Sequence, residues 1–574
     1  MSRKTLLLFS LLLIPALQTA FAQQLTRQPA VPAPKQIVWQ QLEQTMFVHF
    51  DPATWQGTSA DNHSTPLSRI NPDKLDVNQW IDVAELWGAK MIMYVAKHAG
   101  GFCWWQTETT PYSIKNTSYK NGKGDVLADL SAACVKRGMK LGIYISPSDE
   151  SFGAYAGGGG RTKDPARQEE YNQVLRRQWE EVLSRTPGIS EIWFDGSVVV
   201  PLEDIIKKYA PDAIVFQGPF ADIRWVGNER GFAPYPAWNS VKVSDAHSGT
   251  ATAAHGDPDG EVWMPAEVDV TLKNHDWFWS PANYSKLRSC SELIDIYYNS
   301  VGHGCQLLLN SAPDTTGLIP PEDVALYKQF GAEITRRFGK SIAETSGKGN
   351  VVELNFDKPT LVDHVIIQED IAFGERVKHY VIEGNAGGNW FQVSSGISVG
   401  YKRIDQFKPF TVSRLRFRCT ESSLPPIIKR LAAFYVNDTK DHNTMVSDRD
   451  DYGTPWVKGE QKASSELSAG KLDGFVFANG VYEADISPFI PLPGQYEIAV
   501  RNTKTTKSIT PANVVLLLYS QETPGLVSIK DNGICEVSIS AYPTREKGSI
   551  KLNIKLPEKI KPDDLELFIR EIQF

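Results

Sequence analysis

Four polar residues in the first half of the chain each stand near the end of a short apolar run: His49, His98, Tyr144 and Asp195. In an α/β barrel, side chains at the carboxyl ends of the parallel strands gather at one face, where active sites lie. A carboxylate there, with aromatic neighbours and no metal motif, suits glycoside hydrolysis. In that reaction one carboxylate attacks the anomeric carbon and a second carboxylic acid protonates the leaving oxygen. The same residues could instead bind a sugar without cleaving it.

The elements that would position these residues follow a β/α alternation from Thr45 to about residue 340. Short apolar runs predict strands, and stretches with apolar residues three or four apart predict helices between them. Eight such runs predict a (β/α)8 barrel of the TIM type. The predicted strands are Met46–Phe50, Lys90–His98, Lys140–Ser146, Glu191–Gly196, Ala213–Gly218, Asp222–Gly227, Glu261–Thr271 and Cys305–Pro313. The predicted helices include Asp125–Arg137, Arg167–Ser184 and Ser291–Ser300.

After residue 345 period-two strands replace the helical pieces, which predicts a β-sandwich over residues 341–440 behind a barrel domain over 23–340. The expected strands of this sandwich are Val351–Phe356, His364–Gln368, His379–Gly384, Thr411–Arg418 and Leu431–Val436. A polar linker leads to a further β-rich region, and we predict a second sandwich of unknown role over residues 441–574. Thirteen of the 15 Trp residues precede position 340, so the aromatic surface suited to sugar rings is concentrated in the barrel.

The first 22 residues have the form of an export signal, with Arg3 and Lys4 before a Leu-rich run and with Ala20 and Ala22 framing a cleavage site. We therefore expect an exported protein, periplasmic or extracellular. Sixty Lys and Arg stand against 67 Asp and Glu without a basic block, which disfavours a nucleic-acid partner. Because no later apolar stretch is long enough and no CxxC or HExxH spacing occurs, we expect neither a membrane span nor a bound metal.

Several runs resemble, in their order along residues 36–340, the α-L-fucosidases of glycoside hydrolase family twenty-nine. These runs are Phe47-Val48-His49-Phe50, Ala96-Lys97-His98 with Gly101-Phe102, Trp193-Phe194-Asp195-Gly196, Arg224-Trp225-Val226-Gly227-Asn228-Glu229 and Leu307-Leu308-Leu309-Asn310. The fourth run, together with Pro265–Val270 and Trp277-Phe278, is similar to the branch that includes α-1,3/1,4-fucosidases. The sandwich over 341–440 resembles the discoidin-type carbohydrate-binding module often attached to that branch.

The resemblance implies a retaining exo-α-L-fucosidase that needs no cofactor and acts on fucosylated oligosaccharides or glycoconjugates. Asp195 would be the nucleophile and Glu229 the general acid/base, with a covalent fucosyl-enzyme intermediate. Two carboxyl groups about 5–5.5 Å apart push their pKa values apart, so that one can start ionised and the other protonated. Glu267, on a predicted strand, is the rival acid/base. The motif favours Glu229 and leaves Glu267 as a contact to the substrate.

The other substrate-binding candidates are aromatic or imidazole side chains. Under the resemblance, His49, His98 and Tyr144 would hydrogen-bond the fucose hydroxyls, and Trp225 or Trp277 would face the ring or its C6 methyl group. A structural role for each is an equal alternative, because position alone does not separate direct from indirect contacts.

Two segments depart from the family pattern. Lys97–Phe102 reads Lys-His-Ala-Gly-Gly-Phe where the family usually has Lys-His-His-Asp-Gly-Phe, and Lys273–Asp276 stands before Trp277 where the branch usually has Arg-Pro-Gly. A lost histidine removes hydrogen bonds to sugar hydroxyls, which would change the preferred glycone, the linkage or the rate. Two alternatives therefore stay open: a glycan-binding protein on a degenerate barrel, and a hydrolase of another deoxy or galacto-configured sugar.

Overall fold

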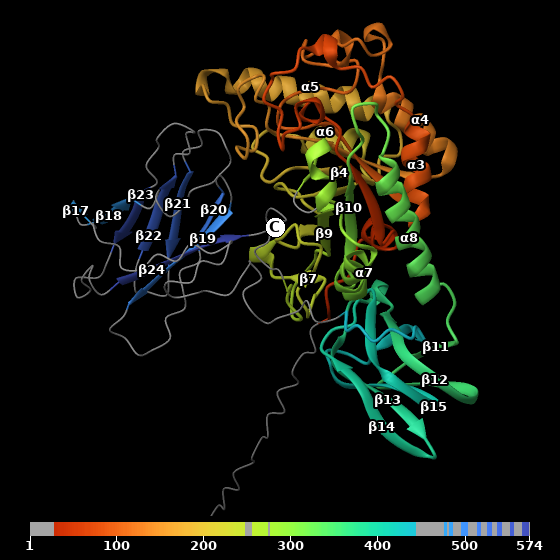
Figure 1. The fold of residues 1–574 in the computed structure, drawn as a ribbon. Helices are drawn as coiled ribbons and strands as arrows, with labels where there is room; N and C mark the ends of the chain where they lie inside the picture. The colour runs from red at the N-terminus through yellow and green to blue at the C-terminus, as the bar shows by residue number, and fades with distance from the viewer. Residues whose placement is uncertain are drawn as a thin grey trace, which may run out of the picture.

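The computed structural model describes residues 28–246, 255–273 and 276–442, and the backbone of eight strands between positions 476 and 572 (Figure 1). The predicted export signal over residues 1–22 lies outside the described residues. Among the helices of the described ranges, none is both long and apolar enough to cross a membrane.

An eight-stranded parallel sheet forms the core of the first domain and confirms the predicted (β/α)8 barrel. All eight predicted strands are present, in the order β5-β4-β3-β2-β1-β10-β9-β6, and a parallel bridge between Phe216 and Ile223 links the two outer strands. Their residues are almost all buried, as expected for parallel strands covered on both faces. The strands are β1 (Gln44–Val48), β2 (Met91–Lys97), β3 (Lys140–Ile145), β4 (Glu191–Trp193), β5 (Ile214–Phe216), β6 (Arg224–Trp225), β9 (Ala266–Thr271) and β10 (Gln306–Ser311).

Helices cover part of the outside of this barrel (Figure 1). Local signals fix their ends: α4 begins where the Asp125 carboxylate accepts a hydrogen bond from Ala128 N and ends at left-handed Gly138, and a capping box of Ser289 and Glu292 starts α7. The helices are α1 (Pro34–Gln40), α2 (Ala53–Gln56), α3 (Val77–Leu86), α4 (Val126–Arg137), α5 (Gln168–Arg185), α6 (Glu203–Tyr209), α7 (Cys290–Asn299) and α8 (Pro321–Phe338). The predicted helices correspond to α4, α5 and α7.

The barrel departs from regular β/α alternation between β5 and β9. Residues 217–223 alone connect β5 to β6, and the described part of the connection from β6 to β9 holds only the short strands β7 (Ser240–Val241) and β8 (Val262–Trp263) and the 3-10 turn Val243–Asp245. Helix α1 instead packs at the amino end of the barrel, where Trp39 Nε1 donates to Glu191 Oε2 at 2.6 Å. Because Glu191 is the first residue of β4, α1 closes the end of the barrel opposite the predicted site.

The second domain is a sandwich of antiparallel strands in the order β11-β16-β12-β15-β13-β14. Its strands are β11 (Ala343–Lys348), β12 (Val351–Glu369), β13 (Val377–Ala386), β14 (Asn389–Gly396), β15 (Arg403–Ser422) and β16 (Ile427–Phe434). Two predicted strands, 351–356 and 364–368, merge into β12, whose register shifts between Asn355 and Thr360 instead of turning. The edge strands β11 and β14 were not predicted from the sequence. β11 is almost entirely polar and has no alternation of apolar residues, and it is a strand because its backbone pairs with β16.

Beyond residue 442 the structure describes the backbone of strands in a five-stranded sheet, β17-β18-β23-β22-β21, and a three-stranded sheet, β20-β19-β24. Their pairings are antiparallel. A second sandwich over 441–574 stays a prediction, and its linker lies largely outside the described residues. The strands are β17 (Val476–Ala478), β18 (Val481–Asp485), β19 (Gln495–Asn502), β20 (Val514–Leu517), β21 (Gly525–Lys530), β22 (Glu536–Ala541), β23 (Lys551–Lys555) and β24 (Leu565–Ile572).

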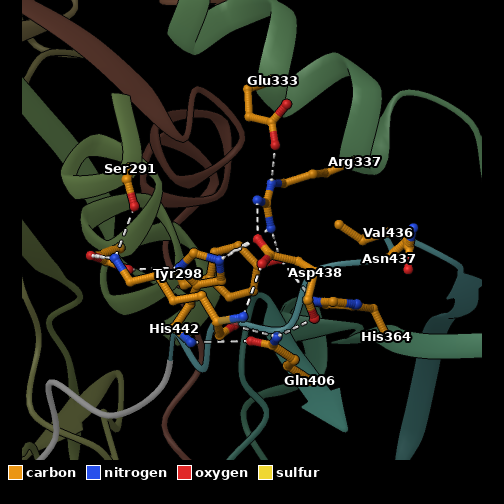
Figure 2. A network of polar contacts seen from close by, with 12 residues as sticks. Ser291, Tyr298, Glu333, Arg337, His364, Gln406, Val436, Asn437, Asp438 and His442 are labelled. Carbon is orange, nitrogen blue, oxygen red and sulfur yellow. Dashed lines mark hydrogen bonds and ion pairs between the residues drawn. The ribbon is translucent and has the colours of Figure 1, made fainter. Parts of the chain in front are cut away.

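A buried polar network joins the barrel helices to the residues that follow the sandwich (Figure 2). Arg337 of α8 donates to the Asp438 carboxylate and, at 3.1 Å, to the Tyr298 hydroxyl of α7. The His442 imidazole lies between Asp295 at 2.6 Å and Asp438 at 2.8 Å. Burial alone would raise the pKa of Asp438, but hydrogen bonds from His442, a backbone amide and Arg337 hold that pKa well below its usual value.

Replacing Arg337 by Met should destabilise the protein, because Asp438 would lose its guanidinium partner. Breaking a fully buried pair costs about 3–5 kcal/mol. Since the Asp438 side chain is 20% exposed, we expect the free energy of unfolding to fall by about 2 kcal/mol in a denaturant titration. Lys207→Met, which removes an ion pair with Glu203 whose two side chains are 73% and 54% exposed, is the control and should cost less than about 0.5 kcal/mol. Equal losses would contradict a stabilising role of the network.

Candidate active site

The carboxyl ends of β1 to β4 bring four of the predicted residues into one cluster. The ring centroids of His49 and His98 lie 6.0 Å apart, and those of His98 and Tyr144 lie 5.8 Å apart. The Tyr144 hydroxyl donates to Asp195 Oδ2 at 3.0 Å. Tyr144 is buried while Asp195, just past the end of β4, is exposed. The Asp195 carboxylate is thus held by a buried phenol and still open to an incoming ligand.

The two histidines of the pocket are neutral hydrogen-bonding groups. Burial lowers the pKa of His49 well below its usual value, with a further contribution from His98, and burial also lowers the pKa of His98. His49 Nδ1 lies 2.7 Å from Asn310 Oδ1, and because that amide oxygen only accepts, Nδ1 donates and Nε2 is left as an acceptor. Neutral imidazoles of this kind can bind sugar hydroxyls.

Asn310, at the carboxyl half of β10, links two parts of the site. Its Oδ1 orients His49, and its Nδ2 donates to the Trp277 backbone carbonyl at 2.8 Å. The sequence motif ending at Asn310 was noted only for its resemblance, and no role was predicted for this residue. Asn310 is the polar residue at the end of an apolar strand, and this position could have indicated a role in the site.

The side chain of Tyr144 remains protonated beside Asp195. Burial raises the pKa of Tyr144 well above its usual value, and the Asp195 charge raises it further. The protonated phenol donates its hydrogen bond to the Asp195 side chain and so orients it. The backbone after Asp195 is also held, because Gly196 N donates to Gln217 Oε1 at 2.5 Å.

Glu229 lies on the loop that follows β6. Trp277 Nε1 donates to Glu229 Oε2 at 3.1 Å. Burial raises the pKa of Glu229 to about 8, the charges of Asp269 and Asp195 also raise it, and the Trp277 hydrogen bond acts in the opposite direction. At neutral pH Glu229 is therefore protonated, which is the state that a general acid requires at the start of the reaction.

A third carboxyl group, Asp269 on β9, belongs to the same cluster and was missed as a site residue. Trp225 Nε1 donates to Asp269 Oδ1 at 2.7 Å. Burial raises the pKa of Asp269 to about 8, and Glu267 and Asp195 contribute. Because side chains alternate along a strand, Glu267 and Asp269 share the inner face of β9, and Asp269 stands one layer nearer its carboxyl end. That period-two spacing was the signal available in the sequence.

Glu267 lies deeper in the barrel, toward the end that α1 closes. Its Oε1 accepts a hydrogen bond from Trp193 Nε1 at 2.9 Å. Burial raises the pKa of Glu267 well above its usual value, and the Glu191 charge adds to the shift. The structure therefore pairs Glu267 with Glu191 at the floor of the barrel and brings Asp269 to the cluster with Glu229.

The two predicted tryptophans each bind one carboxyl group of the site. Trp225 and Trp277 are half-buried and pack against an apolar cluster inside the barrel that includes Phe47. The Trp277 ring centroid lies 4.9 Å from that of His49. Both indoles thus offer an apolar face near the pocket, while their N–H groups are directed at Asp269 and Glu229.

The structure shows the surroundings of one residue in each segment that departs from the family pattern. A Cβ atom at Gly100 would lie 2.6 Å from Cβ of Asp61, a buried residue whose Oδ2 accepts a hydrogen bond from the Tyr112 hydroxyl at 2.6 Å. A carboxylate from the segment after α2 thus occupies the space that a side chain at position 100 would need. Lys273 forms a buried ion pair with Asp323 of α8, which ties the end of β9 to the barrel wall.

The described part of the chain holds no group of three His, Cys, Asp or Glu side chains arranged to bind a metal ion. The carboxyl groups at the mouth accept hydrogen bonds from Tyr144, Trp225 and Trp277.

Comparisons with known proteins identify the family of the chain. Residues 30–337 match the family model for alpha-L-fucosidase. Alpha-L-fucosidase 1 of Arabidopsis thaliana is 30% identical over 454 residues, which cover 70% of this chain and 87% of the plant protein. A provisionally named alpha-L-fucosidase from Bacteroides thetaiotaomicron is similar in crystal structure, with a TM-score of 0.67 and 33% identity over 71% of this chain and 100% of that one.

A second solved structure carries a ligand. It is a fucosidase of glycoside hydrolase family twenty-nine from Ruminococcus gnavus in complex with fucose, with a TM-score of 0.62 and 25% identity over 71% of this chain and 96% of that one. The match to the family model spans more than half of the chain and includes the whole barrel. The chain therefore belongs to the alpha-L-fucosidase family of glycoside hydrolases.

Proposed function

We propose that the protein is a retaining exo-α-L-fucosidase in which Asp195 is the nucleophile and Glu229 the general acid/base. The observation that carries this proposal is the contrast between the two carboxyl groups. Asp195 is exposed and bound by the Tyr144 hydroxyl, whereas the pKa of Glu229 is raised to about 8 by burial and by neighbouring carboxyl groups. Such a pair divides the roles of nucleophile and acid at neutral pH.

In the first step Asp195 attacks the anomeric carbon while Glu229 gives its proton to the leaving oxygen, and a fucosyl ester forms on Asp195. In the second step Glu229, now ionised, takes a proton from water, which attacks the same carbon and releases fucose. His49 and His98 bind hydroxyl groups of the glycone, and Tyr144 keeps Asp195 oriented in both steps. Trp277 holds Glu229 through both of its charge states.

The substrate class is a terminal α-L-fucosyl group of oligosaccharides or glycoconjugates, with α-1,3/1,4 linkages. Its support is the run Arg224–Glu229 and the later Pro265–Val270, which resemble that branch of the family. The fucose complex of the Ruminococcus gnavus relative supports the glycone. We further propose export, to the periplasm or the outside of the cell, from the form of residues 1–22, and a carbohydrate-binding role for the sandwich over 341–440.

Asp195→Gly should nearly abolish turnover of an aryl α-L-fucoside and leave the fold intact, because Asp195 is exposed and its loss opens no buried cavity. Added azide should restore part of the rate by attacking the anomeric carbon from the vacated side, and it should yield a fucosyl azide. Release of the aryl group and product analysis measure both effects. Activity like that of the wild type in a folded Asp195→Gly protein would contradict the assignment.

Glu229→Ala should reduce kcat/KM most for substrates with poor leaving groups, because an activated aryl group departs with little protonation. We expect a loss of about 100-fold or more on a fucosylated oligosaccharide and a much smaller one on an activated aryl fucoside. Glu267→Gln is the matched control, since it changes the carboxyl group at the barrel floor, and it should affect both substrates equally. If Glu267→Gln instead lost more activity on the oligosaccharide than on the aryl fucoside, and Glu229→Ala affected both equally, Glu267 would be the acid.

Asp269→Asn should shift the alkaline limb of the kcat/KM profile to lower pH. The acid must be protonated, so activity falls as the pH rises through the raised pKa of Glu229. Removing the Asp269 charge takes away one cause of that raised pKa, and we expect the limb to move down by about 1 pH unit. A full pH profile with one substrate measures the shift. An unchanged limb would show that Asp269 does not act on the acid.

A further inference from the structure

The loop that carries Glu229 continues directly into contacts with the sandwich. Glu229 follows β6, and the chain then passes Tyr235 and Asn239 before it reaches β7. Both of these residues bind the sandwich, at two separate places. The candidate acid/base is therefore close in sequence to residues that bind the sandwich, although no residue of the sandwich belongs to the site described above.

The Tyr235 hydroxyl has all of its hydrogen-bonding capacity used by the sandwich. It donates to the Ser398 carbonyl at 2.9 Å and accepts from the backbone amides of Ile397 at 2.8 Å and Ser398 at 3.1 Å. The Arg403 guanidinium lies 4.0 Å from the centre of the Tyr235 ring. A Cβ atom at Gly396 would lie 2.5 Å from the Tyr235 hydroxyl and 2.4 Å from that of Tyr380 within the sandwich, so the segment approaches as closely as a glycine permits.

A second attachment of the same loop lies four residues further on. The Asn239 backbone amide and side-chain amide both donate to Glu375 Oε2, at 2.9 and 3.2 Å. Near β8, Lys378 of the sandwich also pairs with Asp259 at 2.6 Å. Two buried polar contacts and one exposed ion pair thus fix the connection from β6 to β9 against the sandwich.

The stretch between Glu229 and Tyr235 is itself tied to the barrel. Arg230 forms an antiparallel bridge with Val270 of β9. The Ala233 amide donates to the Asn299 carbonyl at 2.8 Å, and His303 Nδ1 donates to the Ala233 carbonyl at 2.7 Å. These contacts on both sides restrict the movement of the segment. A displacement at the sandwich contact would therefore also move the Glu229 carboxyl group.

The geometry points to the sandwich as a positioning element for the acid/base loop, with the Tyr235 hydroxyl as its positioning residue. This inference rests on the proposed role of Glu229. The described part of the connection after β6 has no covering helix, and the sandwich takes that place. The sandwich then holds a catalytic loop as well as any glycan that it binds. Proton transfer requires correct placement of Glu229. Weakening the contact between Tyr235 and the sandwich should therefore slow the departure of leaving groups that must be protonated.

The same sandwich is attached to the barrel elsewhere, which supplies a matched control. The Tyr401 hydroxyl donates to Glu43 Oε1 at 3.1 Å, just before β1 and on a different part of the barrel. Tyr401→Phe removes one hydroxyl from this interface, as Tyr235→Phe does, but leaves the acid/base loop untouched. A purely structural role would make the two variants behave alike.

The test measures kcat/KM of the full chain on a fucosylated oligosaccharide and on an activated aryl α-L-fucoside, with thermal stability recorded beside it. For Tyr235→Phe we expect about a tenfold loss on the oligosaccharide and less than about a threefold loss on the aryl fucoside. Gly396→Ala, which presses on the same hydroxyl from the sandwich side, should give the same pattern. Tyr401→Phe should leave the ratio between the two substrates at its wild-type value.

An unchanged ratio in both Tyr235→Phe and Gly396→Ala, or the same selective loss in Tyr401→Phe, would overturn the inference. Glu229→Ala, measured on the same two substrates, separates this outcome from a failure of the proposed function. If Glu229→Ala shows the leaving-group effect and Tyr235→Phe does not, the acid is correct and its support by the sandwich is wrong. If neither shows it, the assignment of the acid itself fails.

Discussion

Mutual repulsion among buried carboxyl groups is the constraint on which the site depends. Asp195, Glu229 and Asp269 share the mouth of one barrel. Burial raises the pKa values of Glu229 and Asp269; the charges of Asp269 and Asp195 add to the shift of Glu229, and the charges of Glu267 and Asp195 add to that of Asp269. Burial and charge repulsion together keep Glu229 and Asp269 protonated at neutral pH, beside the exposed Asp195 side chain. The division between nucleophile and acid follows from that difference in exposure.

The fold supplies the donors that hold this arrangement. Tyr144, Trp225 and Trp277 come from different strands and loops, and each donates one hydrogen bond to a different carboxyl group. At the other end of the barrel α1 and the pair of Glu191 and Glu267 close the floor, which leaves the mouth as the open face. The sandwich reaches the same site from outside, through the loop that carries Glu229.

The sequence was sufficient to predict the barrel, because its strands are apolar runs between amphipathic helices, and it placed His49, His98, Tyr144 and Asp195 at one face. It did not separate Glu267 from Asp269, since both lie on the inner face of β9 and only the depth of each layer distinguishes them. Other features were beyond prediction because they join segments distant along the chain.

Asp61 fills the space at Gly100 from another loop, and Tyr235 binds a segment more than 150 residues away in sequence.

The most direct measurement of the division of roles is to identify the residue labelled by a 2-deoxy-2-fluoro-α-L-fucosyl fluoride, by peptide mapping of the trapped enzyme. The fluorine slows hydrolysis of the intermediate, so the nucleophile keeps the sugar. A label on Asp195 is the predicted result. A label on Glu229 or Asp269 would contradict the division of roles among the three carboxyl groups.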